Sequence, residues 1–203
     1  MTRVVLASAN PGKLRELSAL LAPCALELAA QSDFGVDSPP ETGTTFLENA
    51  LIKARHAARA AGLPAIADDS GIEVDALDGR PGVYSARYAG EGAGDERNNA
   101  LLIRELAGVP PARRGARYRA VIVFVRDADD PRPLIAAGTW EGRIAAAPAG
   151  AGGFGYDPIF EPAGETCTAA QLPAARKNAL SHRGQALRAL VAGLTEAGYI
   201  RAP

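Results

Sequence analysis

Residues 8–13 combine the groups that can hold a phosphate at the start of a helix. The segment consists of Ser8, Ala9, Asn10, Pro11, Gly12 and Lys13, directly after a buried apolar run. Asn10 suits a helix cap and Pro11 the first helical position, so unpaired N–H groups and the positive helix dipole would point at an anion. Gly12 allows close approach and Lys13 adds a charge. The leading glycine of a Walker loop is missing, so the segment predicts another kind of phosphate site, or an ordinary capped turn.

Three carboxylates stand where they could bind a cation. Glu41 lies in a loop before a helix, and Asp68 and Asp69 end the apolar strand that contains Ile66 and Ala67. Because adjacent strand residues point to opposite sides, only one of the two aspartates is expected to face a given site. Adjacent acids are costly to bury without a cation, and oxygen ligands beside phosphate favour Mg²⁺ over zinc. A polar strand end that caps the next turn would give the same pattern.

The last third of the chain offers aromatic rings and polar groups for a base. Glycines surround Phe154 and Tyr156 in residues 152–158, so both rings could be exposed for stacking. A polar and basic group then leads into the last predicted helix: Lys177, Ser181, His182 and Arg183. Cations at a helix N-terminus oppose its dipole, which favours a functional reason for them. A glycine-rich hairpin with a surface basic cluster is the plainer alternative.

Lysine is rare in this chain. Of the 22 basic residues 19 are Arg, and the three lysines are Lys13, Lys53 and Lys177. Where Lys persists in such a chain, a compact ammonium is favoured over a guanidinium fork. Lys53 also shares a polar helix face with Asn49 and His56, at helical spacing. The lysines are therefore candidates for the phosphate side of a site.

Alternating strands and helices would position these groups. Short apolar runs predict strands at residues 4–7, 26–30, 65–67, 120–125 and 134–144. Apolar periodicity predicts helices at residues 11–21, 44–61, 95–107 and after Ser181. The last two strands form a hairpin in this interpretation, so the sheet should be mixed and the class α/β. We expect a single domain over residues 1–203.

The overall composition excludes several classes of protein. The 203 residues are 47% hydrophobic and 22% charged, which rules out a mostly disordered chain. The net charge is −1, so no nucleic acid polymer is expected as a partner. No apolar stretch reaches the roughly 20 residues of a membrane span, and we expect neither a signal peptide nor a membrane partner. Only Cys24 and Cys167 are present, which favours a reduced, cytoplasmic setting.

Five motifs that carry these groups occur in order along the chain. They read SANPGK at 8–13, ETGTTFLENA at 41–50, ADDSG at 67–71, GGFGYDP at 152–158 and SHRG at 181–184. With them the sequence closely resembles the inosine/xanthosine triphosphate pyrophosphatases, which remove non-canonical purine nucleotides. The resemblance covers essentially the whole chain. It implies a two-lobed ITPase-like (Maf/Ham1-type) α/β fold around a long mixed sheet with flanking helices, as a homodimer with Mg²⁺ and substrate in the cleft.

The resemblance also implies an activity and a role for each motif. The expected reaction is hydrolysis of ITP, dITP, XTP or dXTP to the monophosphate and pyrophosphate. Asp69 would be the catalytic acid/base and, with Glu41, a metal ligand, while Lys53 would be catalytic beside the phosphate segment 8–13. The residues on the nucleoside side would be Ser70, Phe154, Gly155, Tyr156, Asp157, Lys177, His182 and Arg183. Arg176 and Gln171 depart from the acidic residues usual in the family.

Charge explains why such a reaction needs these residue types. A triphosphate carries about four negative charges, which repel the electron pair of an attacking water. Mg²⁺ and lysines would neutralise these charges while Asp69 acts as the base. Asp68 is the second candidate for the base. A donor such as Arg183 facing the C6 oxygen would select hypoxanthine and xanthine over adenine.

Two other functions stay open on the sequence alone. One is a pyrophosphatase of the same general fold that acts on pyrimidine or modified nucleotides. The other is a non-catalytic nucleotide sensor, which could lose the acids. Against the sensor, Glu41, Asp68, Asp69 and all three lysines are present.

Overall fold

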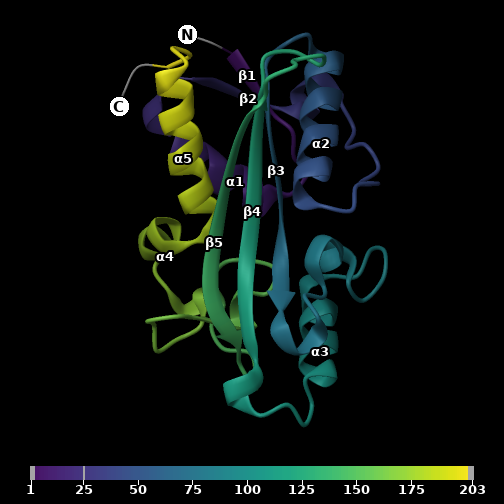
Figure 1. Ribbon diagram of the computed structural model, residues 1–203, viewed down its shortest axis with the longest axis vertical. Helices are drawn as coiled ribbons and strands as arrows, with labels where there is room; N and C mark the ends of the chain where they lie inside the picture. Colours follow the sequence, from purple (N-terminus) through teal and green to yellow (C-terminus); the bar gives the residue numbers. More distant parts are fainter. Residues whose placement is uncertain (1–2, 25, 201–203) are drawn as a thin grey trace. The chain divides into compact units, whose positions relative to one another are not determined.

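The computed structural model describes residues 3–24 and 26–200, and its strands form one six-stranded mixed sheet in the order β2-β1-β3-β4-β5-β6 (Figure 1). The strands are β1 Arg3–Leu6, β2 Glu27–Ala30, β3 Ala65–Val74, β4 Gly115–Val125, β5 Leu134–Ile144 and β6 Phe160–Pro162. Strand β1 pairs in parallel with β2 and β3, whereas β5 pairs antiparallel with β6. The predicted α/β class and mixed sheet are confirmed.

Five α-helices accompany the sheet in the described part of the chain. They are α1 Pro11–Leu21, α2 Phe46–Ala61, α3 Asp95–Glu105, α4 Ala174–Leu180 and α5 His182–Glu196. Asn10 caps α1 as predicted, because its side chain accepts from the backbone N–H groups of Gly12 and Lys13. Thr45 and Glu48 form a reciprocal capping box at the start of α2. Helix α4 and strand β6 were not predicted from the sequence.

The chain divides into two compact units. The first unit consists of Met1–Asp69, Ala120–Gly138 and Arg183–Pro203, and the second of Ser70–Arg119 and Thr139–His182. Strands β3, β4 and β5 each contribute residues to both units. The two units agree with the two lobes expected from the resemblance.

Successive strand residues in the first unit pack on opposite faces of the sheet. Val4, Leu6 and Ile66 belong to the core formed with α1 and α5. Their neighbours Val5 and Ala67 belong to the core formed with α2, whose fully packed residues there are all alanine. These alanines are Ala50, Ala54, Ala57 and Ala58. Because alanine side chains are small, α2 can pack closely against the sheet. Figure 1 shows α2 and α5 on opposite sides of β3 and β4.

The core of the second unit is rich in aromatic side chains. Tyr118 meets Phe160 edge-on, with ring centroids 4.8 Å apart, and Trp140 lies 5.4 Å from the same ring. Leu102 of α3 and Ile72 of β3 complete the contacts that bury this cluster. Aromatic pairs in these arrangements add specific geometry to the burial of apolar surface. The cluster fixes α3 and the segment before β6 within one unit.

The boundaries of two strands were predicted wrongly. The fourth strand was predicted from Ala120, but β4 begins at Gly115. The sequence indicated that the strand of Ile66 and Ala67 ends at Asp68 and Asp69, but β3 continues through both aspartates to Val74. Both carboxylates are buried in mid-strand. Each has a cationic partner at hydrogen-bond distance, which offsets the cost of burying its charge, so the strand need not end there.

Candidate functional site

The first group of charged residues surrounds Lys53 in the first unit. Its Nζ lies 2.7 Å from Asp69 Oδ1 and 2.9 Å from Glu41 Oε1. Lys53 comes from the buried face of α2, Asp69 from β3 and Glu41 from the segment before α2. Because both carboxylates contact one ammonium group, three residues far apart in the sequence converge on one point. The structure thus brings together the residues of this unit that were predicted to be catalytic or metal-binding, and their roles stay predictions.

Burial and charge act in opposite directions on this group. Burial alone would lower the pKa of Lys53, but the carboxylates of Asp69 and Glu41 outweigh it and raise that pKa. Burial raises the pKa of Asp69 above its ordinary value, although Lys53 opposes the shift. A carboxylate with a raised pKa is better suited to take a proton from water.

The same group has oxygen atoms suited to a divalent cation. Asp69 Oδ2 is buried and makes no hydrogen bond within residues 3–24 and 26–200. Glu41 lies beside Asp69 on the same ammonium group, so two carboxylates could supply oxygen ligands. The described residues contain no cluster of three or more Asp, Glu, His or Cys side chains arranged to hold a metal. Magnesium is commonly held by one or two carboxylates with substrate phosphates, so Glu41 and Asp69 fit this ion.

Asp68 belongs to a second charged group with different partners. Its Oδ2 lies 3.0 Å from Lys13 Nζ and 3.2 Å from both Nε and Nη2 of Arg183. Burial would raise the pKa of Asp68, but Arg183 and Lys13 outweigh it and hold that pKa well below its usual range. Asp68 and Asp69 are neighbours in β3, and they have separate ion-pair partners, as the alternation of strand side chains predicted. Only Asp69 combines a raised pKa with the Glu41 carboxylate.

Arg183 connects this second group to α1. Its Nη1 donates to Glu16 Oε2 at 2.5 Å, while Nε and Nη2 donate to Asp68. From the sequence, Arg183 is expected to contact a purine base, and that role stays a prediction. Glu16 was not predicted. Its position three residues after Lys13 on the same helix is the one signal in the sequence that could have found it.

Asp157 organises the candidate residues of the second unit. We call residues 152–157 the aromatic loop. Asp157 Oδ2 accepts from the Phe154 backbone N–H at 2.9 Å and from Lys177 Nζ at 2.5 Å. The Lys177 ammonium also lies 4.9 Å from the centre of the Phe154 ring, within cation–π range. At Gly153, where φ is +71°, a Cβ would lie 2.0 Å from Asp157 Oδ2, so this position requires glycine.

The two rings of the aromatic loop differ in exposure. Phe154 is half-buried, but Tyr156 is only 4% exposed, and its hydroxyl donates to the Ser85 carbonyl at 2.8 Å. The prediction that Tyr156 offers an exposed stacking surface is therefore wrong, because its ring packs in the core. His182 is buried and stacks in parallel on Tyr118, with ring centroids 4.5 Å apart. Ser70 is half-buried in β3.

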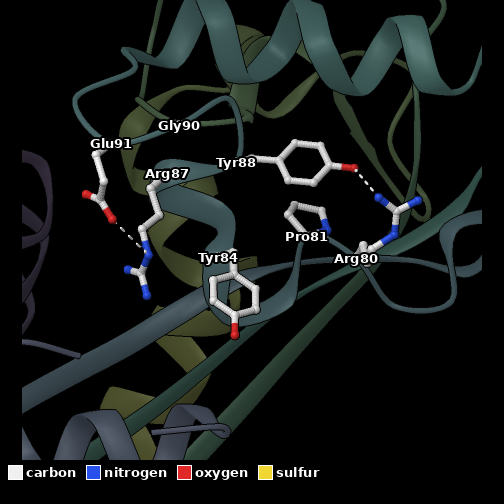
Figure 2. Close-up of a pocket in the computed structure, with 7 residues that line it drawn as sticks. All are labelled: Arg80, Pro81, Tyr84, Arg87, Tyr88, Gly90 and Glu91. Carbon is white, nitrogen blue, oxygen red and sulfur yellow. Dashed lines mark hydrogen bonds and ion pairs between the residues drawn. The ribbon is translucent and has the colours of Figure 1, made fainter. Parts of the chain in front are cut away.

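Two surface pockets are lined by residues other than the predicted site residues. One, of about 390 Å³, is drawn in Figure 2 and is lined by Arg80, Pro81, Tyr84, Arg87, Tyr88, Gly90 and Glu91. Arg87 points toward Glu91 and Arg80 toward the Tyr88 hydroxyl, so its cations already have partners. The other, of about 410 Å³, is lined by Thr42, Gly43, Thr44, Glu48, Leu51, Ile52 and Arg55. Neither pocket is lined by a residue that the sequence assigned to the site.

The fold and the charged groups define an α/β protein whose paired lysines and carboxylates are of the types that bind phosphates and divalent cations. The sequence matches the Ham1 family over residues 4–193, and the chain belongs to that family. It is 56% identical to a dITP/XTP pyrophosphatase of Shigella flexneri over 96% of this chain and 98% of that protein. A second dITP/XTP pyrophosphatase, from Escherichia coli strain K12, is 55% identical over the same shares. A HAM1 protein of Coxiella burnetii superimposes with a TM-score of 0.89 at 48% identity, covering 97% of this chain and 100% of that one.

Proposed function

We propose that the chain hydrolyses non-canonical purine nucleoside triphosphates, namely ITP, dITP, XTP and dXTP, to the monophosphate and pyrophosphate. The observation that carries this proposal is the convergence of Glu41 and Asp69 on Lys53 Nζ. Relatives that are more than half identical over nearly their whole length are dITP/XTP pyrophosphatases, which supports the choice of substrate.

The charged groups of the first unit supply the phosphate chemistry in this proposal. Asp69 takes a proton from the attacking water, for which its raised pKa is suited. Lys53 and Lys13 balance the negative charge of the phosphates, and the start of α1 offers N–H groups and the positive end of its dipole. Glu41 and Asp69 would hold Mg²⁺, which supplies neutralisation of the charge that develops on the leaving pyrophosphate.

The residues of the second unit supply recognition of the nucleoside. The half-buried Phe154 ring is the surface on which a purine would stack, and Lys177 and Asp157 fix its orientation. Ser70 and His182 are assigned to the same side by the resemblance. Because base stacking tolerates any purine, discrimination between bases has to come from polar groups fixed in place around it.

An experiment with a panel of nucleotides tests this function. ITP, XTP, dITP, ATP and GTP are incubated with the purified chain with and without Mg²⁺, and pyrophosphate is measured against orthophosphate. The proposal expects pyrophosphate from the first three substrates, Mg²⁺ dependence, and poor turnover of ATP and GTP. Preferential turnover of pyrimidine nucleotides would favour the related pyrophosphatase, and binding without turnover would favour the sensor.

We also infer a cytoplasmic homodimer. Cys24 and Cys167 are both free, which suits a reducing compartment. The described part of the chain contains no helix long and apolar enough to cross a membrane. Light scattering after gel filtration tests the dimer, since a monomeric mass at micromolar concentration would contradict it.

A further inference from the structure

Two side chains of α3 hold a single glycine of the aromatic loop. Asp95 Oδ2 accepts from the Gly155 backbone N–H at 2.6 Å, and Asn99 Nδ2 donates to the Gly155 carbonyl at 3.1 Å. Asp95 and Asn99 are four residues apart and therefore lie on the same face of the helix. Both backbone polar groups of Gly155 are thus bound by one turn of α3, and we call this pair the α3 clamp.

The glycine that the clamp holds lies between the two rings of the loop. Gly155 has a φ of +63°, in the left-handed region, and carries no side chain that could fix its position by packing. On one side the Phe154 backbone is bound to Asp157, and on the other the Tyr156 hydroxyl is bound to Ser85. The torsion angles at Gly155 therefore decide how the Phe154 ring is presented relative to the anchored Tyr156.

The amide group of Asn99 is buried, and only one of its two polar atoms has a partner among the described residues. Its residue is 6% exposed, and its Oδ1 is buried with no hydrogen-bond partner among the residues that the structure describes. A buried acceptor without a donor is destabilising, and an apolar side chain of the same size would avoid it. Holding the Gly155 carbonyl is the contact that explains an asparagine at this position.

We propose that Asp95 and Asn99 are positioning residues that fix the aromatic loop for recognition of the purine base. The inference rests on the proposed function, because it assigns the loop to the nucleoside. The clamp acts through Gly155 on the Phe154 ring and on the loop backbone that Asp157 holds. Its loss should therefore displace both the stacking ring and the polar groups of Asp157 and Lys177. Binding and selection of the base should then weaken more than the chemical step.

Asn98 provides a matched control on the same helix. It is 2% exposed and is as polar as its neighbour, but it accepts from the Ala89 N–H at 2.8 Å and donates to the Ala86 carbonyl at 3.2 Å. Its contacts hold residues 86–89, at the Figure 2 pocket, and neither of these hydrogen bonds involves Gly155. Replacing either asparagine removes side-chain hydrogen bonds of α3, but only the replacement of Asn99 removes a bond to Gly155.

The experiment compares Asn99→Ala, Asn98→Ala, Asp95→Ala and Asp95→Asn in steady-state kinetics with ITP and GTP, alongside thermal unfolding. Asn99→Ala and Asp95→Ala should raise KM for ITP about tenfold, the scale of one lost hydrogen bond, while kcat changes much less. The ratio of kcat/KM for ITP over GTP should narrow in both. Asp95→Asn keeps an acceptor for the Gly155 N–H and should restore a KM near the wild-type value. Asn98→Ala should lower the melting temperature without moving KM or the ratio.

Three results would overturn the inference. The first is an unchanged KM and ITP/GTP ratio in Asn99→Ala and Asp95→Ala. The second is an equal rise of KM in Asn98→Ala, which would mean that stability alone is responsible. If Asn99→Ala does not fold, Asp95→Ala should still do so because Asp95 is exposed, and the KM of Asp95→Ala alone then tests the clamp. The third is a wild-type chain that hydrolyses none of the purine substrates, and that result alone would also overturn the proposed function.

Discussion

The charged groups of the first unit and the aromatic loop of the second are stabilised in different ways. In the first, side chains on regular elements hold one another, as Lys53 does with Asp69 and Asp68 with Arg183. In the second, backbone groups of an irregular segment are held by side chains, as Gly155 is by Asp95 and Asn99. The first arrangement should therefore depend on the identity of each charged residue, and the second on the shape of the backbone.

Removing Arg183, which binds Asp68 together with Lys13, should give the largest effect. Arg183→Ala leaves the buried Asp68 carboxylate without two of its donors and should lower the free energy of unfolding by about 3–5 kcal/mol. Urea denaturation measures this change. Arg59→Ala is the control, because Arg59 and its partner Asp129 are both exposed and should contribute less than about 1 kcal/mol.

The same variant also tests the predicted role of Arg183 in reading the base. If Arg183 recognises the C6 oxygen, kcat/KM should fall far more with ITP than with ATP in any folded Arg183→Ala sample. An unchanged ITP/ATP ratio with reduced stability would show that Arg183 acts through Asp68 and Glu16 instead. Unfolding at the wild-type urea midpoint would contradict the prediction for the buried group.

Neutralising the candidate base should be the next largest effect. Asp69→Asn should reduce turnover of ITP by roughly 100-fold or more, the scale of a lost general base, and leave the fold intact. Asp129→Asn, at an exposed carboxylate, should leave kcat unchanged. A near-normal rate in purified Asp69→Asn would make Asp68 the candidate instead.

Replacing a lysine by arginine should have a smaller effect on kcat, and the size of that effect should differ between the two regions. Lys53→Arg places a bulkier, forked cation between Glu41 and Asp69 and should lower kcat about tenfold although the charge is kept. Lys177→Arg should lower it less, since a guanidinium also binds a carboxylate and stacks on an aromatic ring such as Phe154. Equal losses in the two variants would remove the distinction between the regions.

The smallest effect is expected at the cap of α2, outside both regions. Hydrogen bonds from Thr44 and Thr45 lower the pKa of Glu48 below its ordinary value of about 4.5. The ionised carboxylate therefore contributes stability above that value, and the contribution is lost as pH falls through the lowered pKa. The difference in melting temperature between wild type and Glu48→Gln should be constant near pH 7 and shrink toward pH 3. A pH-independent difference would contradict this.

Local chemistry made much of the fold predictable. The cap at Asn10, the long helix before Gly62 and the alternation at Asp68 and Asp69 depend on neighbours within a few residues, and all three were found from the sequence. Helix α4 and strand β6 were missed because seven and three residues are too few to show a period. Strand β3 was ended too early because its acids are tolerated only through partners distant in the chain.

The same distance limit applies to the candidate site residues. Glu16 acts on a residue 167 positions away, and Asp95 and Asn99 act on one 60 and 56 positions away. Apart from the position of Glu16 three residues after Lys13, nothing in their own segments distinguishes them from residues of an ordinary polar helix face. Glu41, Lys53 and Asp69 were found because their residue types carry chemistry and because lysine is rare in this chain.

The rarity of lysine has a practical consequence for labelling. Lys13, Lys53 and Lys177 are the only side chains in the sequence that carry a primary amine, and they are 15%, 8% and 8% exposed. Each is paired with a carboxylate and largely buried, so an acylating reagent has little access to its amine. Amine-reactive reagents, which label surface lysines on most proteins, should therefore label few side chains of this one. The rate at which each lysine becomes acylated should report on how often the contacts that bury it open.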